Sequence, residues 1–499
     1  MTGSARQYGP AVALLACGAF AARTLTLTHQ SLWLDEVDAV AFAQQDLPTL
    51  LRMMVSPAQN GGLFYLLLKG WLPLVGLSEF TLRYAAVLPS VLVIPLLYAL
   101  GRRLFSPEAG FWAALLAATS PYLFFYAQEG KMYALYACLA VWDMYLFMAA
   151  LHQGGRWRWL GYGAVTALGL YVHLFFVFLV VAQHTIALAV AWRSWGRLRG
   201  WYLTQGTLAL PLLPLALWGV PAALWGYPTA FTPLPLGTIL QVLLLRFTLH
   251  TESWPSPVVL VPFAAAGVAA LLVPGPVPDV GIGLRPTPPS PTGRERTGAW
   301  AAGARPGRVV VLLWLVVPVL SYYLVSFQVP AFMHRYFTML VPAYYLALGV
   351  GLAALRGRWP LLGLLSAAAI LGVWGAAVLR PVEVRPDFRG AAHFVTARAQ
   401  EGDAVLFVAE YGVRAFAFYA PDHPPALTAP YTNDGVPAEV AVAALQERSA
   451  PYRRVWLVLF EDWLWDGRRI TRNWLERRGT QVEAAGFPGI TVLAYRLDR

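Results

Sequence analysis

The sequence is short of charged residues. Only 13% of its 499 residues are charged, whereas a soluble protein of this length carries about a quarter. Hydrophobic residues make up 58% of the chain, and the mean hydropathy is +0.54. Apolar runs of about 18 residues recur along most of the sequence, and each is long enough to cross a bilayer core of roughly 30 Å. The composition therefore argues against a soluble globular protein and indicates an α-helical, multi-pass membrane protein.

Cysteine and lysine are also scarce. The two cysteines, Cys17 and Cys138, both lie inside apolar runs, which excludes a disulfide framework and a cysteine-based zinc site. The only lysines are Lys69 and Lys131, in a chain whose net charge of +11 comes from arginine. Basic residues of a membrane protein serve first to orient its spans. We therefore do not expect nucleic acid to be a partner.

Apolar segments predict about eleven spans. They cover residues 10–27, 83–100, 109–126, 132–151, 159–173, 174–192, 204–226, 257–273, 309–326, 336–354 and 359–379. The segment 61–76 is apolar too, but it is short and contains Lys69 and Pro73, so we predict an interfacial or re-entrant helix. The first span imitates a signal peptide at Ala19-Phe20-Ala21, although an uncleaved span suits a polytopic protein better.

The distribution of basic residues predicts the orientation. With a cytoplasmic N-terminus, fifteen basic residues fall in cytoplasmic segments and five in outer segments. The five are Arg52, Lys69, Lys131, Arg246 and Arg335. This bias follows the positive-inside rule. It places the first outer loop, 28–82, and everything after residue 380 outside the cell membrane of what we expect to be a prokaryotic protein.

The sequence pattern of the chain changes at two places, in residues 274–308 and after residue 380. Residues 274–308 are rich in Pro, Gly, Thr and Arg without periodicity, which predicts a disordered cytoplasmic linker. A membrane domain over 1–380 is followed by a tail, 381–499, in which helical and strand patterns alternate. The predicted elements are helices near 387–399, 437–448 and 470–478, strands at 404–409 and 455–460, and a terminal hairpin across 487–489. The tail therefore predicts a small extracytoplasmic α/β domain.

An acidic pair, Asp35-Glu36, follows the first span. The simplest interpretation of Asp35 is a helix N-cap, with Asp38 three positions on as in a capping box. Adjacent residues point about 100° apart on a helix, so the pair does not match the two opposed carboxyl groups of a glycosidase. One carboxylate acting as a base fits better. Asp35 and Asp38 share a face and leave a divalent metal ion open as a further interpretation.

Other ionisable residues recur at the predicted outer ends of spans. They are Glu129, Lys131, His173, His250, Glu252, His334 and Arg335, with Tyr336 next to the last. Singly, each is most simply a solvated loop residue. Together they predict one outer cavity lined by cations and a carboxylate. Asp143 and His184 lie deeper within spans, where ionisable residues are functional candidates, although an internal pair explains them equally well.

The order of these motifs resembles a GT-C glycosyltransferase of the family-39-like group, which contains protein O-mannosyltransferases and lipid A aminoarabinose transferases. The matching segments are 32–36 with the acidic pair, 62–69 with 78–83, 126–135, and Arg335-Tyr336 followed by Pro342. Relatives usually carry Arg where Lys131 stands. They also commonly show His or Lys followed by Pro where this chain has Gln59-Asn60-Gly61-Gly62, which puts in doubt any phosphate or metal contact from that segment.

The resemblance implies an inverting transfer from a polyprenyl-phosphate-linked sugar donor to a hydroxyl or amine of a protein, lipid or glycan acceptor. Asp35 would be the general base, and Glu36 would orient the acceptor or the loop. Lys131 and Arg335, helped by Tyr336, would stabilise the phosphate leaving group. No cofactor is implied with certainty, and a divalent metal ion stays open.

Two other classes of protein remain as alternatives. A lipid or sugar transporter or flippase would use Asp143 and His184 in a relay, although the sequence lacks the inverted repeat that many transporters display. A non-catalytic envelope protein would bind glycans or partners through tail aromatics, of which Trp456, Trp463 and Trp465 are the candidates.

Overall fold

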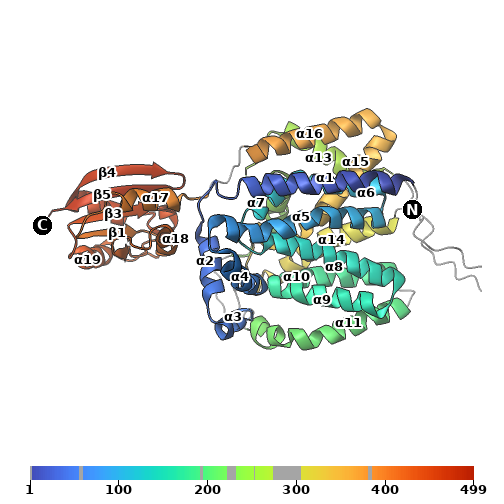
Figure 1. Ribbon diagram of the computed structural model, residues 1–499, viewed down its shortest axis with the longest axis horizontal. Coiled ribbons are helices and arrows are strands. Elements are labelled where there is room, and N and C mark those ends of the chain that lie inside the picture. Colours follow the sequence, from blue (N-terminus) through green and yellow to red (C-terminus); the bar gives the residue numbers. More distant parts are fainter. Residues whose placement is uncertain are drawn as a thin grey trace, which may run out of the picture. The chain divides into compact units, whose positions relative to one another are not determined.

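The computed structural model describes residues 3–55, 60–191, 195–221, 232–251, 253–273, 305–379 and 385–498. Within these residues the chain forms two compact units (Figure 1). The helical unit comprises Met1–Thr26, Gln45–Leu77 and Thr81–Val382. The sheet unit comprises Leu27–Gln44, Ser78–Phe80 and Glu383–Arg499. Most of the predicted disordered linker, 274–304, lies outside the described residues.

Long helices make up the helical unit, and Figure 1 shows most of them running roughly side by side. In chain order they are α1 (Gly3–Leu25), α3 (Leu47–Met53), α4 (Gly62–Val75), α5 (Glu79–Leu104), α6 (Pro107–Thr119), α7 (Pro121–Ala127), α8 (Tyr133–Gln153), α9 (Arg156–Val172), α10 (Phe176–Ala191), α11 (Trp195–Pro214), a π-helical turn (Leu215–Gly219), α12 (Leu236–Leu249), α13 (Pro257–Leu272), α14 (Arg305–Val325), a 3₁₀ helix η3 (His334–Leu340), α15 (Val341–Arg358) and α16 (Pro360–Leu379).

Six helices of the described residues are long and apolar enough to cross a membrane, and a seventh span results if the bent pair α6–α7 counts as one. The chain is therefore a multi-pass membrane protein. Every predicted span coincides with a helix, but several are short: α10 and α13 have 16 residues each. The count of eleven stays a prediction. Helix α12 had no counterpart among the predicted elements.

The bend between α6 and α7 measures 55° and has a local cause. Pro121 has no amide hydrogen and disfavours helical geometry at the residue before it. Ser120 accordingly leaves the helix and caps the next one, its Oγ accepting a hydrogen bond from the Leu123 amide at 3.1 Å. The short helix α7 then leads into the turn that carries Glu129 and Lys131.

Arg23 is fully buried in the helical unit and has hydrogen-bond partners there. It donates to the carbonyl oxygens of Ser90, at 2.9 Å, and Ala117, at 2.8 Å. Because an apolar surround supplies no water, a buried charged group needs such partners. The guanidinium thereby ties α1 to α5 and α6.

Asp143, which is also fully buried, accepts hydrogen bonds from Thr166 Oγ1 at 2.7 Å and Gln183 Nε2 at 2.5 Å. These contacts join α8 to α9 and α10. His184 instead packs its ring 5.1 Å from that of Trp201. Asp143 and His184 therefore have separate partners, which favours a structural role for Asp143 over the relay of the transporter alternative.

The sheet unit is built on five strands in the order β2-β1-β3-β5-β4. They are β1 (Asp403–Phe407), β2 (Ala426–Thr428), β3 (Arg454–Leu459), β4 (Gly479–Phe487) and β5 (Ile490–Leu497). Strand β1 runs parallel to β2 and β3, while β5 is antiparallel to β3 and β4. The helices are α2 (Leu34–Gln44), α17 (Phe388–Thr396), α18 (Gly412–Tyr419), α19 (Ala438–Ser449), α20 (Asp462–Trp465) and α21 (Ile470–Arg478).

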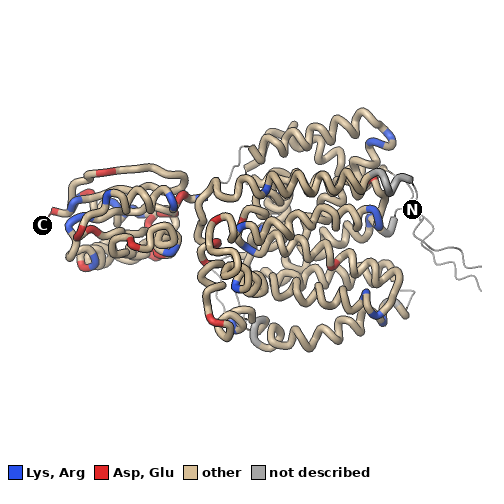
Figure 2. Tube along the Cα trace, in the orientation of Figure 1, with Lys and Arg blue, Asp and Glu red and all other residues tan. Residues whose placement is uncertain are grey.

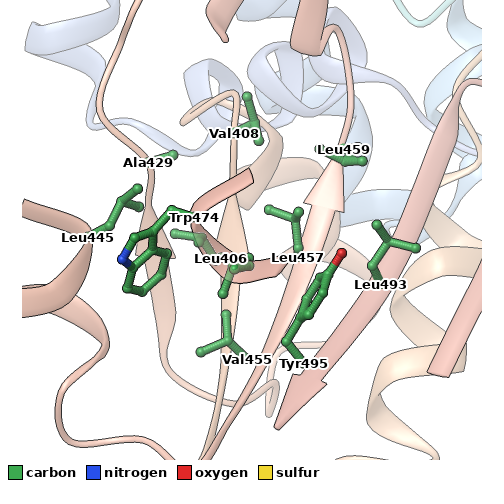
Figure 3. Close-up of a cluster of buried hydrophobic side chains, with 11 residues drawn as sticks. Leu406, Val408, Ala429, Leu445, Val455, Leu457, Leu459, Trp474, Leu493 and Tyr495 are labelled. Carbon is green, nitrogen blue, oxygen red and sulfur yellow. The ribbon is translucent and has the colours of Figure 1, made fainter. Parts of the chain in front are cut away.

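Side-chain alternation along the central strands explains why helices cover both faces. On one face Leu406 and Leu457 pack with Leu445 of α19 and Trp474 of α21, forming the cluster drawn in Figure 3. On the other face Phe407 contacts Phe416 of α18. The predicted tail elements correspond in position to α17, β1, α19, β3, α21 and the β4–β5 hairpin, whereas α18, β2 and α20 were not predicted.

Asp403 is the first residue of β1, and its hydrogen bonds to β3 provide a test of the sheet unit. Its Oδ2 accepts from Arg454 Nη2 at 2.6 Å, Arg454 Nε at 3.0 Å and Trp456 Nε1 at 2.9 Å. We expect Asp403→Ala to destabilise this unit by about 1–3 kcal/mol, because it leaves the buried Trp456 indole without its acceptor, while the Arg454 guanidinium keeps the Arg398 carbonyl.

Hydrogen exchange of the β1 and β3 amides in the full chain measures this effect. The control is Glu476→Ala, which breaks an exposed i,i+4 pair with Arg472 and should change stability by no more than about 0.5 kcal/mol. Equal protection of these amides from hydrogen exchange in the two variants would show that Asp403 does not stabilise the sheet.

Candidate functional site

The acidic pair lies in the sheet unit, on the first turn of α2. The helix begins at Leu34, and the carbonyl of Trp33 accepts from the amides of Glu36, at 3.0 Å, and Val37, at 3.1 Å. The Trp33 amide in turn donates to Glu36 Oε2 at 3.4 Å. Glu36 therefore supplies the side chain of a capping-box arrangement, and the interpretation of Asp35 as the N-cap is wrong because Asp35 already sits inside the helix.

The carboxylates beside Asp35 are held by arginines of the same unit. Glu36 is fully buried, and its Oε2 lies 3.8 Å from Arg385 Nη1, which is 7% exposed. Asp38 Oδ1 lies 2.6 Å from Arg414 Nη1 on α18. The ion pair at Asp38 works against the interpretation that Asp35 and Asp38 share a divalent ion. In the described part of the chain no three His, Cys, Asp or Glu side chains are grouped as a metal site.

Hydrogen bonds fasten the segment before α2 to the start of α17. Ser31 Oγ donates to the Pro386 carbonyl at 2.7 Å and accepts from the Phe388 amide at 3.1 Å. Gln30 Oε1 accepts from the Arg385 amide at 3.0 Å. The acidic loop after the first span is therefore positioned by residues more than 350 positions away in the sequence.

A second set of predicted site residues gathers in the helical unit, around the turn between α7 and α8. Lys131 is 7% exposed, and its Nζ donates to the Tyr65 hydroxyl at 3.0 Å and lies 5.2 Å from the centre of that ring. Glu129 is 1% exposed, and its carbonyl accepts from the Lys131 amide at 2.7 Å. Arg335 lies over the ring of Tyr133, with its Cζ 5.8 Å from the ring centre.

Aromatic contacts connect these residues to the predicted histidines. His250 packs on Phe125 with ring centres 4.5 Å apart and on Tyr122 at 5.5 Å. His334 lies 6.2 Å from Tyr122 and 6.4 Å from His250. His250 closes α12 in a left-handed conformation, with φ of 54°, which a non-glycine residue adopts at a cost of about 1–2 kcal/mol.

His173 and Tyr336 complete the group. The His173 ring stacks on Tyr136 at 4.8 Å with an interplanar angle of 16° and contacts Tyr336 at 4.9 Å. Tyr136 also donates to the Tyr336 carbonyl at 3.2 Å. Tyr133 links His173 to the aromatic residues around His250. Its ring lies 5.1 Å from Tyr126, which contacts His250, and 6.4 Å from His173.

One chain of ring contacts in the helical unit brings together His173, His250, His334, Arg335 and Tyr336. Glu129 and Lys131 lie in the turn between α7 and α8, the two helices that carry the tyrosines of this chain. Glu252 lies outside the described residues. A lysine ammonium and a guanidinium among tyrosine hydroxyls can bind an anion such as a phosphate and stabilise charge that develops on it.

The segment that departs from the family pattern has a structural task. Asn60 Oδ1 accepts from the Leu174 amide at 3.1 Å, and the Gly61 amide donates to the Val172 carbonyl at 2.9 Å. Gly61 has φ of +100°, and a Cβ there would lie 2.9 Å from the Tyr65 ring. The segment thus ties the start of α4 to the break between α9 and α10 and leaves room for the tyrosine that contacts Lys131.

Several residues of this region were not predicted as site residues. Arg246 is 3% exposed, and Arg246 and Glu129 both interact electrostatically with the Tyr122 hydroxyl. Its position in the sequence, among the few basic residues of predicted outer segments, was the available signal. The tyrosines at 65, 122, 133 and 136 give no such signal, because aromatic residues are common throughout the spans. Figure 2 shows that the middle of the helical unit is nearly free of charged residues, with basic residues toward both ends of its helices.

Comparison with known proteins finds one family match and several similar folds. Residues 62–218, which include Lys131 and His173, match the family described as dolichyl-phosphate-mannose-protein mannosyltransferase. No curated protein matches the chain in sequence. The fold is similar to that of ArnT from Cupriavidus metallidurans in the apo state, with a TM-score of 0.58, 13% identity, and 97% of each chain covered.

Two further structures have the same fold. ArnT from Cupriavidus metallidurans bound to undecaprenyl phosphate has a TM-score of 0.57 at 12% identity, with 98% of each chain covered. The apo oligosaccharyltransferase of Archaeoglobus fulgidus has a TM-score of 0.51 at 12% identity. The match covers 99% of this chain and 75% of the oligosaccharyltransferase chain. The resemblance to the GT-C glycosyltransferases is confirmed, in the family match of one segment and in the fold of the chain.

Gly61 offers a test of how the helical unit holds Lys131. We expect Gly61→Ala to destabilise the protein by about 1–3 kcal/mol and to displace Tyr65, because the new methyl group meets its ring and the backbone is left-handed. Thermal unfolding of the detergent-solubilised protein measures the loss.

Gly402→Ala is the control, since Gly402 has φ of +87° in a turn closed by the hydrogen bond from the Asp403 amide to the Gln400 carbonyl and has no atom within 4 Å of its Cβ position. It isolates the backbone cost, about 1 kcal/mol. A melting temperature as high in Gly61→Ala as in the control would show that the Tyr65 contact is unimportant.

Proposed function

We propose that this protein is an inverting glycosyltransferase that moves a sugar from a polyprenyl-phosphate donor to a hydroxyl or amine of an acceptor on the outer face of the membrane. The observation that carries the proposal is the nearly buried Lys131 and the half-buried Arg335, each against a tyrosine ring, with Lys131 and both tyrosines in the segment that matches the mannosyltransferase family. ArnT, which shares the fold, binds undecaprenyl phosphate.

Lys131 and Arg335 are proposed to hold the donor phosphate. A phosphate leaving group requires stabilisation of negative charge more than it requires an acid, and a cation does this best where water is excluded. Both side chains lie against tyrosine rings, and Lys131 is nearly buried. Tyr336, at the start of η3, is proposed to add a contact to the phosphate, and the apolar helices to hold the isoprenoid chain.

Asp35 is proposed to be the general base. It takes the proton from the acceptor hydroxyl or amine while the acceptor oxygen or nitrogen bonds to the anomeric carbon. The bond from that carbon to the phosphate oxygen breaks in the same displacement, and polyprenyl phosphate leaves with inverted stereochemistry in the product. Glu36, buried against Arg385, is proposed to fix the loop that carries the base and not to exchange protons.

The membrane arrangement is part of the proposal. Eleven spans, a cytoplasmic N-terminus, a membrane domain over 1–380 and an extracytoplasmic domain over 381–499 would place these residues outside. The positive-inside distribution of the sequence supports this orientation.

Asp35→Asn tests the proposed base. We expect the rate of transfer to fall by about 10²–10⁴, because an amide cannot take the proton, while binding of undecaprenyl phosphate is unchanged. The assay supplies purified protein with radiolabelled undecaprenyl-phosphate mannose and envelope extract.

The control for this test is Asp46→Asn, which changes the exposed cap of α3 and should leave transfer intact. Equal labelling by Asp35→Asn and the wild type would exclude the catalytic role. Movement of the labelled lipid across a vesicle bilayer without cleavage would favour the flippase instead.

Lys131→Met tests the proposed phosphate contact. We expect undecaprenyl phosphate to bind about 10- to 100-fold more weakly, because a hydrogen bond to a charged group contributes about 1.5–3 kcal/mol. Tryptophan fluorescence titration in detergent measures the affinity.

The chain provides a matched control in Lys69→Met, since Lys69, the other lysine, donates to the Gln45 carbonyl. That variant should bind like the wild type. Unchanged affinity in Lys131→Met would remove the lysine from the donor site.

A further inference from the structure

His173 is buried in the break between α9 and α10, and the backbone there fixes where its proton lies. The side chain is 1% exposed. Its Nδ1 accepts a hydrogen bond from the amide of Phe175 at 3.2 Å. A ring nitrogen that accepts a hydrogen bond carries no proton, so the imidazole is neutral and its proton is on Nε2. The Nε2–H group is therefore the one hydrogen-bond donor of this ring.

This buried donor has no acceptor among the residues that the structure describes. A buried N–H group without an acceptor costs about 1–3 kcal/mol, and buried polar groups in native proteins are nearly always hydrogen-bonded. The ring is held in place on its faces, because it stacks on Tyr136 at 4.8 Å and contacts Tyr336 at 4.9 Å. A ligand that brings an acceptor to Nε2 would offset the cost, and the ring is already oriented for it.

Ring contacts place His173 in the surroundings of Arg335. The Tyr133 ring lies 6.4 Å from the His173 ring, and the Arg335 Cζ lies 5.8 Å from the centre of the same tyrosine ring. Tyr336, which directly follows Arg335 in η3, contacts His173 as well. Tyr136 also fixes this part of η3, since its hydroxyl donates to the Tyr336 carbonyl at 3.2 Å. The imidazole and the guanidinium therefore share their aromatic neighbours.

The backbone beside His173 leads to Lys131. The amide of Gly61 donates to the carbonyl of Val172 at 2.9 Å. Gly61 in turn lies against the Tyr65 ring, to which a Cβ on the glycine would come within 2.9 Å. The hydroxyl of that tyrosine accepts from Lys131 Nζ at 3.0 Å. His173 is thus connected to each of the two proposed phosphate-binding cations by contacts through tyrosines, all of them within the helical unit.

We propose that His173 is a third binding residue for the donor phosphate, a neutral donor whose Nε2–H group forms a hydrogen bond with a phosphate oxygen beside Lys131 and Arg335. This inference rests on the proposed function. A hydrogen bond to an ionised acceptor is about twice as strong as one between neutral groups, and a neutral imidazole adds it without the repulsion that a third cation would meet. The contact strengthens as the bond to the anomeric carbon breaks, because the leaving phosphate gains negative charge.

Two amide substitutions separate the roles of the two ring nitrogens. In His173→Gln the side-chain amide reaches the place of Nε2 and keeps a donor there. In His173→Asn the amide reaches only the place of Nδ1, where its oxygen can still accept from the Phe175 amide. We expect His173→Asn to bind undecaprenyl phosphate about 10-fold more weakly, and His173→Gln to stay within about 3-fold of the wild type. Tryptophan fluorescence titration of the full chain in detergent measures both affinities.

Undecaprenol, which lacks the phosphate, distinguishes a phosphate contact from a structural role. His173→Asn should lose affinity for undecaprenyl phosphate and keep its affinity for undecaprenol. A histidine that only supports the packing would lower both affinities by the same factor, and that result would overturn the proposal. The matched control is His184→Asn, the same substitution at a histidine of the helical unit that packs on Trp201, and it should change neither affinity.

Nuclear magnetic resonance of the wild-type chain labelled with ¹⁵N-histidine observes the Nε2–H group directly and does not depend on the folding of a variant. The signal of His173 is the one that His173→Gln removes from the spectrum. Undecaprenyl phosphate should move its proton resonance downfield and slow its exchange with water, because the proton becomes hydrogen-bonded to an anionic oxygen. Undecaprenol should leave the signal where it is.

The outcomes separate this proposal from the proposed function. Wild-type affinity for undecaprenyl phosphate in His173→Asn, or an Nε2–H signal that this lipid leaves unchanged, overturns the role of His173. Transfer from undecaprenyl-phosphate mannose by the wild type would then still support the glycosyltransferase. The reverse result, a phosphate-dependent loss of binding in His173→Asn with no sugar transfer by the wild type, supports the contact of His173 and overturns the transferase function.

Discussion

A charge that leaves water must find partners in the protein, and this constraint organises both units of the molecule. In the helical unit Arg23 reaches carbonyl oxygens of two neighbouring helices, and Asp143 accepts from a threonine and a glutamine. The helices that these contacts join could not slide or rotate without leaving a charge unsatisfied, and such a charge costs several kcal/mol in an apolar surround. Buried polar groups therefore fix the register of helices whose apolar surfaces alone would allow many arrangements.

The same constraint ties the acidic loop to the C-terminal sheet. Glu36 and Asp38 are adjacent to the proposed base, and each is matched by an arginine of the sheet unit, Arg385 and Arg414. Ser31 and Gln30 add neutral hydrogen bonds to the backbone near α17. A tail that looks like an appended domain in the sequence thus supports the loop after the first span.

The segment 60–61, which departs from the expected family pattern, also has a structural role in the helical unit. Asn60 and Gly61 connect α4 to the α9–α10 break through their side chain and backbone. Gly61 leaves space for Tyr65, which in turn receives the hydrogen bond of Lys131. The Tyr65 hydroxyl fixes the direction of one N–H of Lys131, which matters because an ammonium lacks the fixed fork of a guanidinium.

The sequence by itself determined the multi-pass helical class, the positions of most helices and of the main strands, and the group of residues around Lys131. Apolar length and side-chain period are local properties, and they predict such elements well. The tertiary structure decided what local patterns do not encode. It showed Glu36, not Asp35, as the capping side chain, gave Asp143 and His184 separate partners, and added Arg246 and Tyr65 to the candidates. Those results depend on contacts between residues tens to hundreds of positions apart, and no period or spacing in the sequence records which distant side chain will meet a buried charge.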